Sequence, residues 1–154
     1  MRSICSGQFT DEKVTLPSTP GGGLNCFALL SRDNRCLSQV TEAPITAAWV
    51  SERLDALSLS LRRLTVVVLD NARVHTKAVK ERSSVWQERG LFVVFLPVYS
   101  PHLNLVEVLW RKLKYEWLQA CDYTDKETLH YAVRQALAAV GKSLTIQFGA
   151  FKMI

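Results

Sequence analysis

Long hydrophobic runs are missing from this sequence of 154 residues. The longest apolar stretches, VVVL at 66–69 and LFVVFLPV at 91–98, fall well short of the ~18 residues that a membrane-spanning helix needs. The first residues, MRSICSGQFTDE, also lack the apolar stretch of a secretory signal peptide. The sequence therefore predicts a cytoplasmic protein that has no membrane partner.

Cysteines with the spacing of a metal site are missing as well. The four cysteines stand at positions 5, 26, 36 and 121, and none belongs to a Cys-x-x-Cys pair or to a Cys/His cluster with zinc spacing. We expect free thiols in a reducing compartment.

The composition is that of a globular domain, with 48% hydrophobic and 21% charged residues. The net charge is +5, and most of it lies after residue 70. The balance of Lys and Arg over Asp and Glu is +1 for residues 1–69, +3 for 71–89 and +2 for 90–154, and Asp70 between them contributes −1. Such a distribution is compatible with a phosphate-bearing partner.

Strands and helices are predicted to alternate along the chain. LNCFALLS (24–31) and RCLSQVTE (35–42) indicate a hairpin, because a short turn-forming segment separates them. The β-branched runs LTVVVLD (64–70) and LFVVFL (91–96) predict strands that are buried on both faces. Apolar residues at three- and four-residue spacing predict helices over about residues 46–59, 76–89, 105–118 and 124–140.

The ends of the last helix have recognisable signals. Thr124 and Glu127 predict a capping box at its start, and Gly141 predicts its end. The order hairpin, helix, strand, helix, strand, helix, helix predicts an α/β fold, in which crossover helices join the later strands in parallel.

Asp70 is the first candidate for chemistry, since it ends a predicted buried strand. Ligands of α/β proteins gather at the carboxyl ends of parallel strands, where a carboxylate is held firmly and still faces solvent. The alternative is that Asp70 is simply a turn residue after a strand.

Glu107 is the second candidate, in the first turn of the helix that begins near Leu105. Two structural explanations compete with a functional one. With Asn104 as N-cap, the Glu107 carboxylate could bond back to the cap, or it could pair with Arg111 one turn later. However, Glu107, Arg111 and Lys114 share one polar stripe, and a carboxylate between cations suits a metal site that also holds phosphates.

The strings VVVLDNARVH (66–75) and LPVYSPHLNLVEVLWRKLK (96–114) resemble the DDE transposases of the mariner-like superfamily, in particular those of bacterial insertion sequences. In that family a strand ends in Asp-Asn-Ala with a His shortly after, and a second strand runs into Leu-Pro-x-Tyr-Ser-Pro-x-Leu-Asn-x-x-Glu, a Trp and basic residues. Asp70 and Glu107 match the two acids, and they stand 37 positions apart (107 − 70). The resemblance covers roughly residues 8–140 and implies a single catalytic domain over residues 1–154.

The resemblance implies an RNase H-like fold, a mixed sheet flanked by helices. It places the first catalytic Asp of the family on a first strand upstream of the hairpin, and we expect this chain to lack that strand and any N-terminal helix-turn-helix domain. Asp11, Glu12 and Asp33 are poor substitutes for that Asp, since none ends an apolar strand. A second departure is Leu105, where many members have Pro. We expect this change to have little effect, because Leu propagates a helix well.

The family mechanism uses two Mg²⁺ (or Mn²⁺) ions held by three carboxylates, which activate a water to cut DNA and then a 3′ hydroxyl to attack target DNA. By resemblance, Asp70 and Glu107 are catalytic metal ligands, and Arg111 and Lys114 are candidate phosphate contacts. His75 is expected to cap the helix after it and not to take part in catalysis.

The partners implied are the transposon ends, target DNA and a second chain that supplies the missing N-terminal part. The alternative function is a non-catalytic transposase remnant that binds DNA weakly and without sequence preference. A different RNase H-like nuclease is a more distant possibility, which the loop LPVYSPHLN argues against.

Overall fold

The computed structural model describes residues 23–149 and divides the chain into two compact units. The central unit is Ala43–Glu107, and the flanking unit combines Met1–Glu42 with Val108–Ile154. Cys5, Asp11 and Glu12 lie outside the described residues. None of the described helices combines the length and the hydrophobicity needed to span a bilayer.

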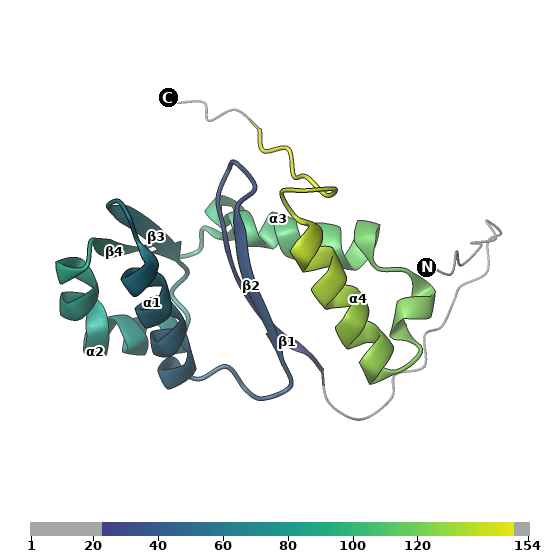
Figure 1. Cartoon of the computed structure of the whole chain (residues 1–154), viewed down its shortest axis with the longest axis horizontal. Helices are drawn as coiled ribbons and strands as arrows, with labels where there is room; N and C mark the ends of the chain where they lie inside the picture. The colour runs from purple at the N-terminus through teal and green to yellow at the C-terminus, as the bar shows by residue number, and fades with distance from the viewer. Residues whose placement is uncertain (1–22, 150–154) are drawn as a thin grey trace. The chain divides into compact units, whose positions relative to one another are not determined.

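The central unit is built from two parallel strands and two helices (Figure 1). Helix α1 (Ala47–Ser60) precedes strand β3 (Thr65–Leu69), and helix α2 (Arg73–Glu88) connects β3 to strand β4 (Leu91–Phe95). The parallel register pairs Thr65 with Leu91 and Leu69 with Phe95, as the predicted crossover requires. The first turn of helix α3 (Leu105–Lys112) completes this unit.

Packing explains why these elements form. Helix α1 begins where the Thr46 side chain accepts a bond from the Trp49 amide, which confirms the predicted start of this helix. The core of the unit comprises Val50, Leu54, Val67, Leu69, Ala78, Trp86 and Leu91.

The prediction that both strands are buried on two faces is wrong. Val66 is 54% exposed and Val68 51%, whereas Val67 and Leu69 are buried, and β4 alternates in the same way. Within residues 23–149 strand β3 pairs with β4 and with no other strand. A β-branched run therefore indicated a strand correctly but did not reveal that alternate side chains of β3 are exposed.

The flanking unit contains the predicted hairpin. Strands β1 (Asn25–Leu30) and β2 (Cys36–Thr41) pair antiparallel, from Asn25 with Thr41 to Leu30 with Cys36. Helix α3 passes into a π-helical turn over Leu113–Trp117 and is followed by a 3₁₀ turn over Ala120–Tyr123. Helix α4 (Lys126–Ala139) packs on β2. Cys26 and Cys36 are free thiols, as predicted.

The start of α4 differs from the prediction. The N-cap is Asp125, whose carboxylate accepts bonds from the amide and the hydroxyl of Thr128 at 2.8 Å each. The Thr124 hydroxyl instead donates to the Cys121 carbonyl at 2.6 Å, so Thr124 and Glu127 form no capping box. The predicted end is confirmed, because the chain turns at Gly141 with φ +77°.

The predicted α/β class is confirmed, and so are the antiparallel hairpin and the parallel pair. The predicted mixed sheet is not formed within residues 23–149, which contain two separate two-stranded sheets. The RNase H-like architecture and the single domain stay predictions.

Candidate metal-binding site

Asp70 lies directly after β3, at the C-terminal end of the parallel strand pair. The Leu96 amide donates to the Leu69 carbonyl at 2.8 Å, so the two strands stay together up to this point. The side chain of Asp70 is 47% exposed. Strand pairing thus fixes the backbone of a carboxylate that solvent can still reach, which is the arrangement predicted for a ligand site.

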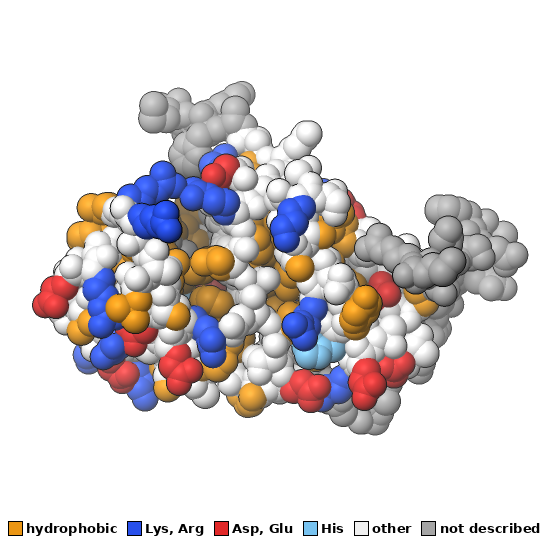
Figure 2. All heavy atoms as spheres, in the orientation of Figure 1, with side chains coloured by type: hydrophobic (Ala, Val, Ile, Leu, Met, Phe, Trp, Pro, Cys, Tyr) orange, Lys and Arg blue, Asp and Glu red, His pale blue; other side chains and the backbone are white. Residues whose placement is uncertain are grey.

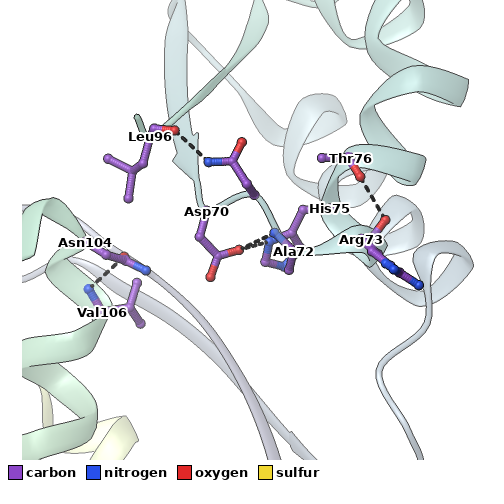
Figure 3. Close-up of polar contacts among 9 residues, drawn as sticks. Asp70, Ala72, Arg73, His75, Thr76, Leu96, Asn104 and Val106 are labelled. Atoms are coloured by element: carbon purple, nitrogen blue, oxygen red, sulfur yellow. Dashed lines mark hydrogen bonds and ion pairs between the residues drawn. The ribbon is translucent and has the colours of Figure 1, made fainter. Parts of the chain in front are cut away.

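The two carboxylate oxygens of Asp70 have different surroundings (Figure 3). Oδ1 accepts a hydrogen bond from the His75 ring, with 2.6 Å between Oδ1 and Nδ1, and another from the Ala72 amide at 3.1 Å. Oδ2 accepts no hydrogen bond from any residue of the 23–149 segment. One oxygen is therefore occupied by the fold, and the other is available to a ligand.

His75 does not cap the following helix, so that prediction is wrong. Helix α2 begins three residues earlier than expected, with Ala72 as its N-cap residue. The amide of His75 donates to the Ala72 carbonyl at 3.0 Å, which places His75 inside the first turn. The His75 side chain is 16% exposed, and its ring faces Asp70.

Asn71 was missed as a candidate by sequence reasoning. Its side-chain amide donates to the Leu96 carbonyl at 2.7 Å and so joins the segment after β3 to the residue that follows β4. The loop that starts at Leu96 leads to Glu107. A polar residue immediately after a strand-end acid was the signal that could have identified it.

Replacing Asn71 with alanine is expected to lower the free energy of unfolding by about 1 kcal/mol, because the Leu96 carbonyl loses its donor. Asn71→Asp, which has the same shape but no donor, should be at least as destabilising, since a carboxylate would then face a carbonyl. Urea denaturation measures both variants. An Asn71→Asp protein as stable as the wild type would contradict this role.

Glu107 lies in the first turn of α3, and Asn104 caps this helix as predicted. The Val106 amide donates to Oδ1 of Asn104 at 3.3 Å, and the Glu107 amide donates to the Asn104 carbonyl at 3.1 Å. The Glu107 side chain is exposed. Among the described residues its carboxylate forms neither the bond back to the cap nor the ion pair with Arg111, so neither structural explanation accounts for this acid.

The donor chemistry of Asp70 and Glu107 fits a hard divalent cation, because both offer exposed carboxylate oxygen. The number of ligands is smaller than the family mechanism needs. Nowhere in residues 23–149 do three or more His, Cys, Asp or Glu side chains gather in a way that could hold a metal ion. Asp33 lies in the hairpin turn of the flanking unit.

Exposed cations lie on α2 and on the helical segment that begins with α3. Arg111 and Lys114 are exposed, and neither forms an ion pair within the described segment. Sequence reasoning did not single out a second set, in which Arg73, Lys77 and Lys80 lie exposed along α2 and begin three residues after Asp70. Lys and Arg side chains are spread over the face shown in Figure 2, with hydrophobic side chains exposed between them. Such cations can contact phosphates.

Comparison with known proteins places the chain in a family. Residues 8–130 match the sequence model of the family described as DDE superfamily endonuclease. No curated protein matches the chain.

Proposed function

This chain belongs to the DDE superfamily endonucleases, and we propose that it is a transposase catalytic domain that cuts DNA and transfers strands during transposition of a bacterial insertion sequence. The observation that carries the proposal is the geometry of Asp70. Its carboxylate ends a strand, one oxygen is fixed by His75 and Ala72, and the other is open.

Asp70 and Glu107 act as metal ligands in this proposal. Bound Mg²⁺ or Mn²⁺ would activate the attacking water or 3′ hydroxyl and neutralise charge on the phosphate. The protein fixes the direction of Asp70 through His75 and ties β3 to the loop before Glu107 through Asn71. Arg111 and Lys114 hold DNA phosphates, and so do the cations of α2.

The third carboxylate comes from outside residues 23–149. Two observations support this part of the proposal: residues 23–149 hold no cluster of three ligands, and within the same residues β3 has one edge without a partner strand. An added strand that carries an Asp could pair with that edge. We propose that a second chain supplies it.

The site is tested by adding Mn²⁺ to the isotope-labelled full chain and recording amide signals. Paramagnetic broadening is expected in two separate segments, 70–75 and 104–108, because both acids hold the same ion. Asp70→Ala should abolish the broadening in both segments, and so should Glu107→Ala. Glu116→Ala serves as control, since Glu116 pairs with Lys112 instead. Broadening confined to one segment would refute a shared site.

Cleavage is a separate measurement, made with labelled duplex DNA and Mg²⁺ or Mn²⁺. If a second chain supplies the third carboxylate, this chain alone is expected to leave the DNA intact. Metal-dependent cleavage that Asp70→Ala abolishes would confirm the endonuclease and refute the need for another strand. A chain that binds DNA weakly, in a salt-sensitive manner, and shows no broadening by Mn²⁺ would instead be a non-catalytic remnant.

A further inference from the structure

The contact with His75 determines how the carboxylate of Asp70 is oriented. Asp70 is followed by a turn that brings His75, five residues later, back onto Oδ1. The Ala72 amide bonds to the same oxygen. A carboxylate held by two donors on one oxygen has little freedom to rotate about its last side-chain bond, whereas an exposed carboxylate with no partner rotates freely.

The hydrogen bond to Asp70 also determines which ring nitrogen of His75 carries a proton. An ionised carboxylate can only accept hydrogen bonds, so Nδ1 of His75 must carry a proton. A nitrogen that donates to Asp70 cannot bind a metal ion through a lone pair. His75 therefore cannot be a metal ligand through Nδ1 while this contact exists.

We propose that His75 is a positioning residue, which holds Oδ1 of Asp70 so that Oδ2 is presented to a divalent cation. This inference rests on the proposed function, because it assumes that the cation binds at Asp70. It adds a residue to the site that acts through Asp70 and does not touch the ion. Histidine and carboxylate pairs that orient metal ligands commonly change metal affinity by about 10- to 100-fold.

The contact itself is tested without metal. In a long-range ¹H–¹⁵N spectrum of the full chain at neutral pH, Nδ1 of His75 should show the shift of a protonated nitrogen. Asp70→Ala should change that signal, while the signals of exposed His102 stay the same. An Nδ1 that carries no proton in the wild type would overturn the inference.

The effect on binding is tested by Mn²⁺ titration of two variants. Asparagine can place an amide nitrogen close to the position of Nδ1, so His75→Asn keeps a donor that His75→Ala removes. We expect His75→Ala to weaken Mn²⁺ binding about 10-fold or more, and His75→Asn to recover most of the affinity. His102→Ala is the control, and circular dichroism verifies that each variant is folded.

The outcomes separate the two proposals. If the wild type binds no Mn²⁺ at Asp70, the proposed function fails, and the positioning role fails with it. If the wild type binds Mn²⁺ and His75→Ala binds equally well, the positioning role alone is wrong. Equal loss in His75→Ala and His75→Asn, with both variants folded, would also overturn it, because the donor would then not matter.

Discussion

Replacing Asp55 with alanine is expected to lower the free energy of unfolding by about 2–3 kcal/mol, because two hydrogen bonds to a charged carboxylate are lost. Asp55 belongs to α1, and its side chain is 27% exposed. Its carboxylate accepts bonds from Nη2 of Arg82 and Nε1 of Trp86, both on α2 and both at 2.7 Å. Trp86 is fully buried, so its indole N–H would have no partner once Asp55 is removed.

The same contacts make this contribution depend on pH. Burial raises the pKa of Asp55, but the bonds from Arg82 and Trp86 and the charges of Arg82 and Arg89 outweigh it, and the pKa is lowered overall. Because the folded-state pKa lies below the value of ~3.9 in an unfolded chain, the contribution is complete above about pH 4. It is lost as the pH falls through the folded-state pKa, so wild type and Asp55→Ala should converge in stability in acid.

Urea denaturation at neutral pH and in acid measures this effect. Glu52→Ala is the matched control, because Glu52 lies on the same helix, is 69% exposed and approaches Arg53 at 3.7 Å only. The control should change stability by less than about 0.5 kcal/mol. A loss in Asp55→Ala no larger than that of the control would mean that these bonds do not hold α1 to α2.

Gly141→Ala is expected to destabilise the chain by about 3 kcal/mol or more. Gly141 has φ +77°, a conformation that costs an L side chain roughly 1–2 kcal/mol. An added Cβ would also lie 2.3 Å from the backbone oxygen of Asn34, so the hairpin turn would have to move. That turn is fixed, because the Asn34 side chain donates to the Ile146 carbonyl at 3.0 Å and accepts from the Ile146 amide at 2.6 Å.

The control for this substitution is Gly149→Ala, where an added Cβ would meet nothing within 4 Å. Thermal unfolding should show a large decrease in melting temperature for Gly141→Ala and almost none for Gly149→Ala. Equal melting temperatures would show that the turn at Asn34 moves without resistance.

Local signals in the sequence predicted most elements of the fold. The apolar stripe predicted a helix from about residue 46, and the structure adds that the Thr46 side chain caps its start. At the start of α4 the predicted cap was Thr124, whereas the structure uses the neighbouring Asp125, which is also a good cap. The burial of β3 was predicted wrongly, since the number of strands beside it and the cover over each face are tertiary properties.

The candidate site was predicted in part, for a similar reason. Asp70 and Glu107 were identified as acids at element ends, and the structure gives their surroundings. The contact of His75 was missed because it depends on α2 beginning at Arg73, three residues before the predicted start. Asp55 was missed because an acid on an amphipathic helix usually faces solvent, and only the packing of α1 on α2 places Trp86 beside it.

The parallel pairing of β3 and β4 has a consequence for how the chain tolerates insertions. Asp70 and Leu96 lie at the C-terminal ends of the two strands. Gly90 and Thr65 lie at the N-terminal ends, where the Thr65 amide donates to the Gly90 carbonyl at 2.9 Å. The segment between Asp70 and Glu107 therefore consists of the crossover helix α2, strand β4 and the loop that leads to α3. An insertion or deletion near Gly90 changes the length of this segment at the strand ends that lie away from Asp70. A single residue inserted between Asp70 and His75 would instead rotate the histidine away from the Asp70 carboxylate.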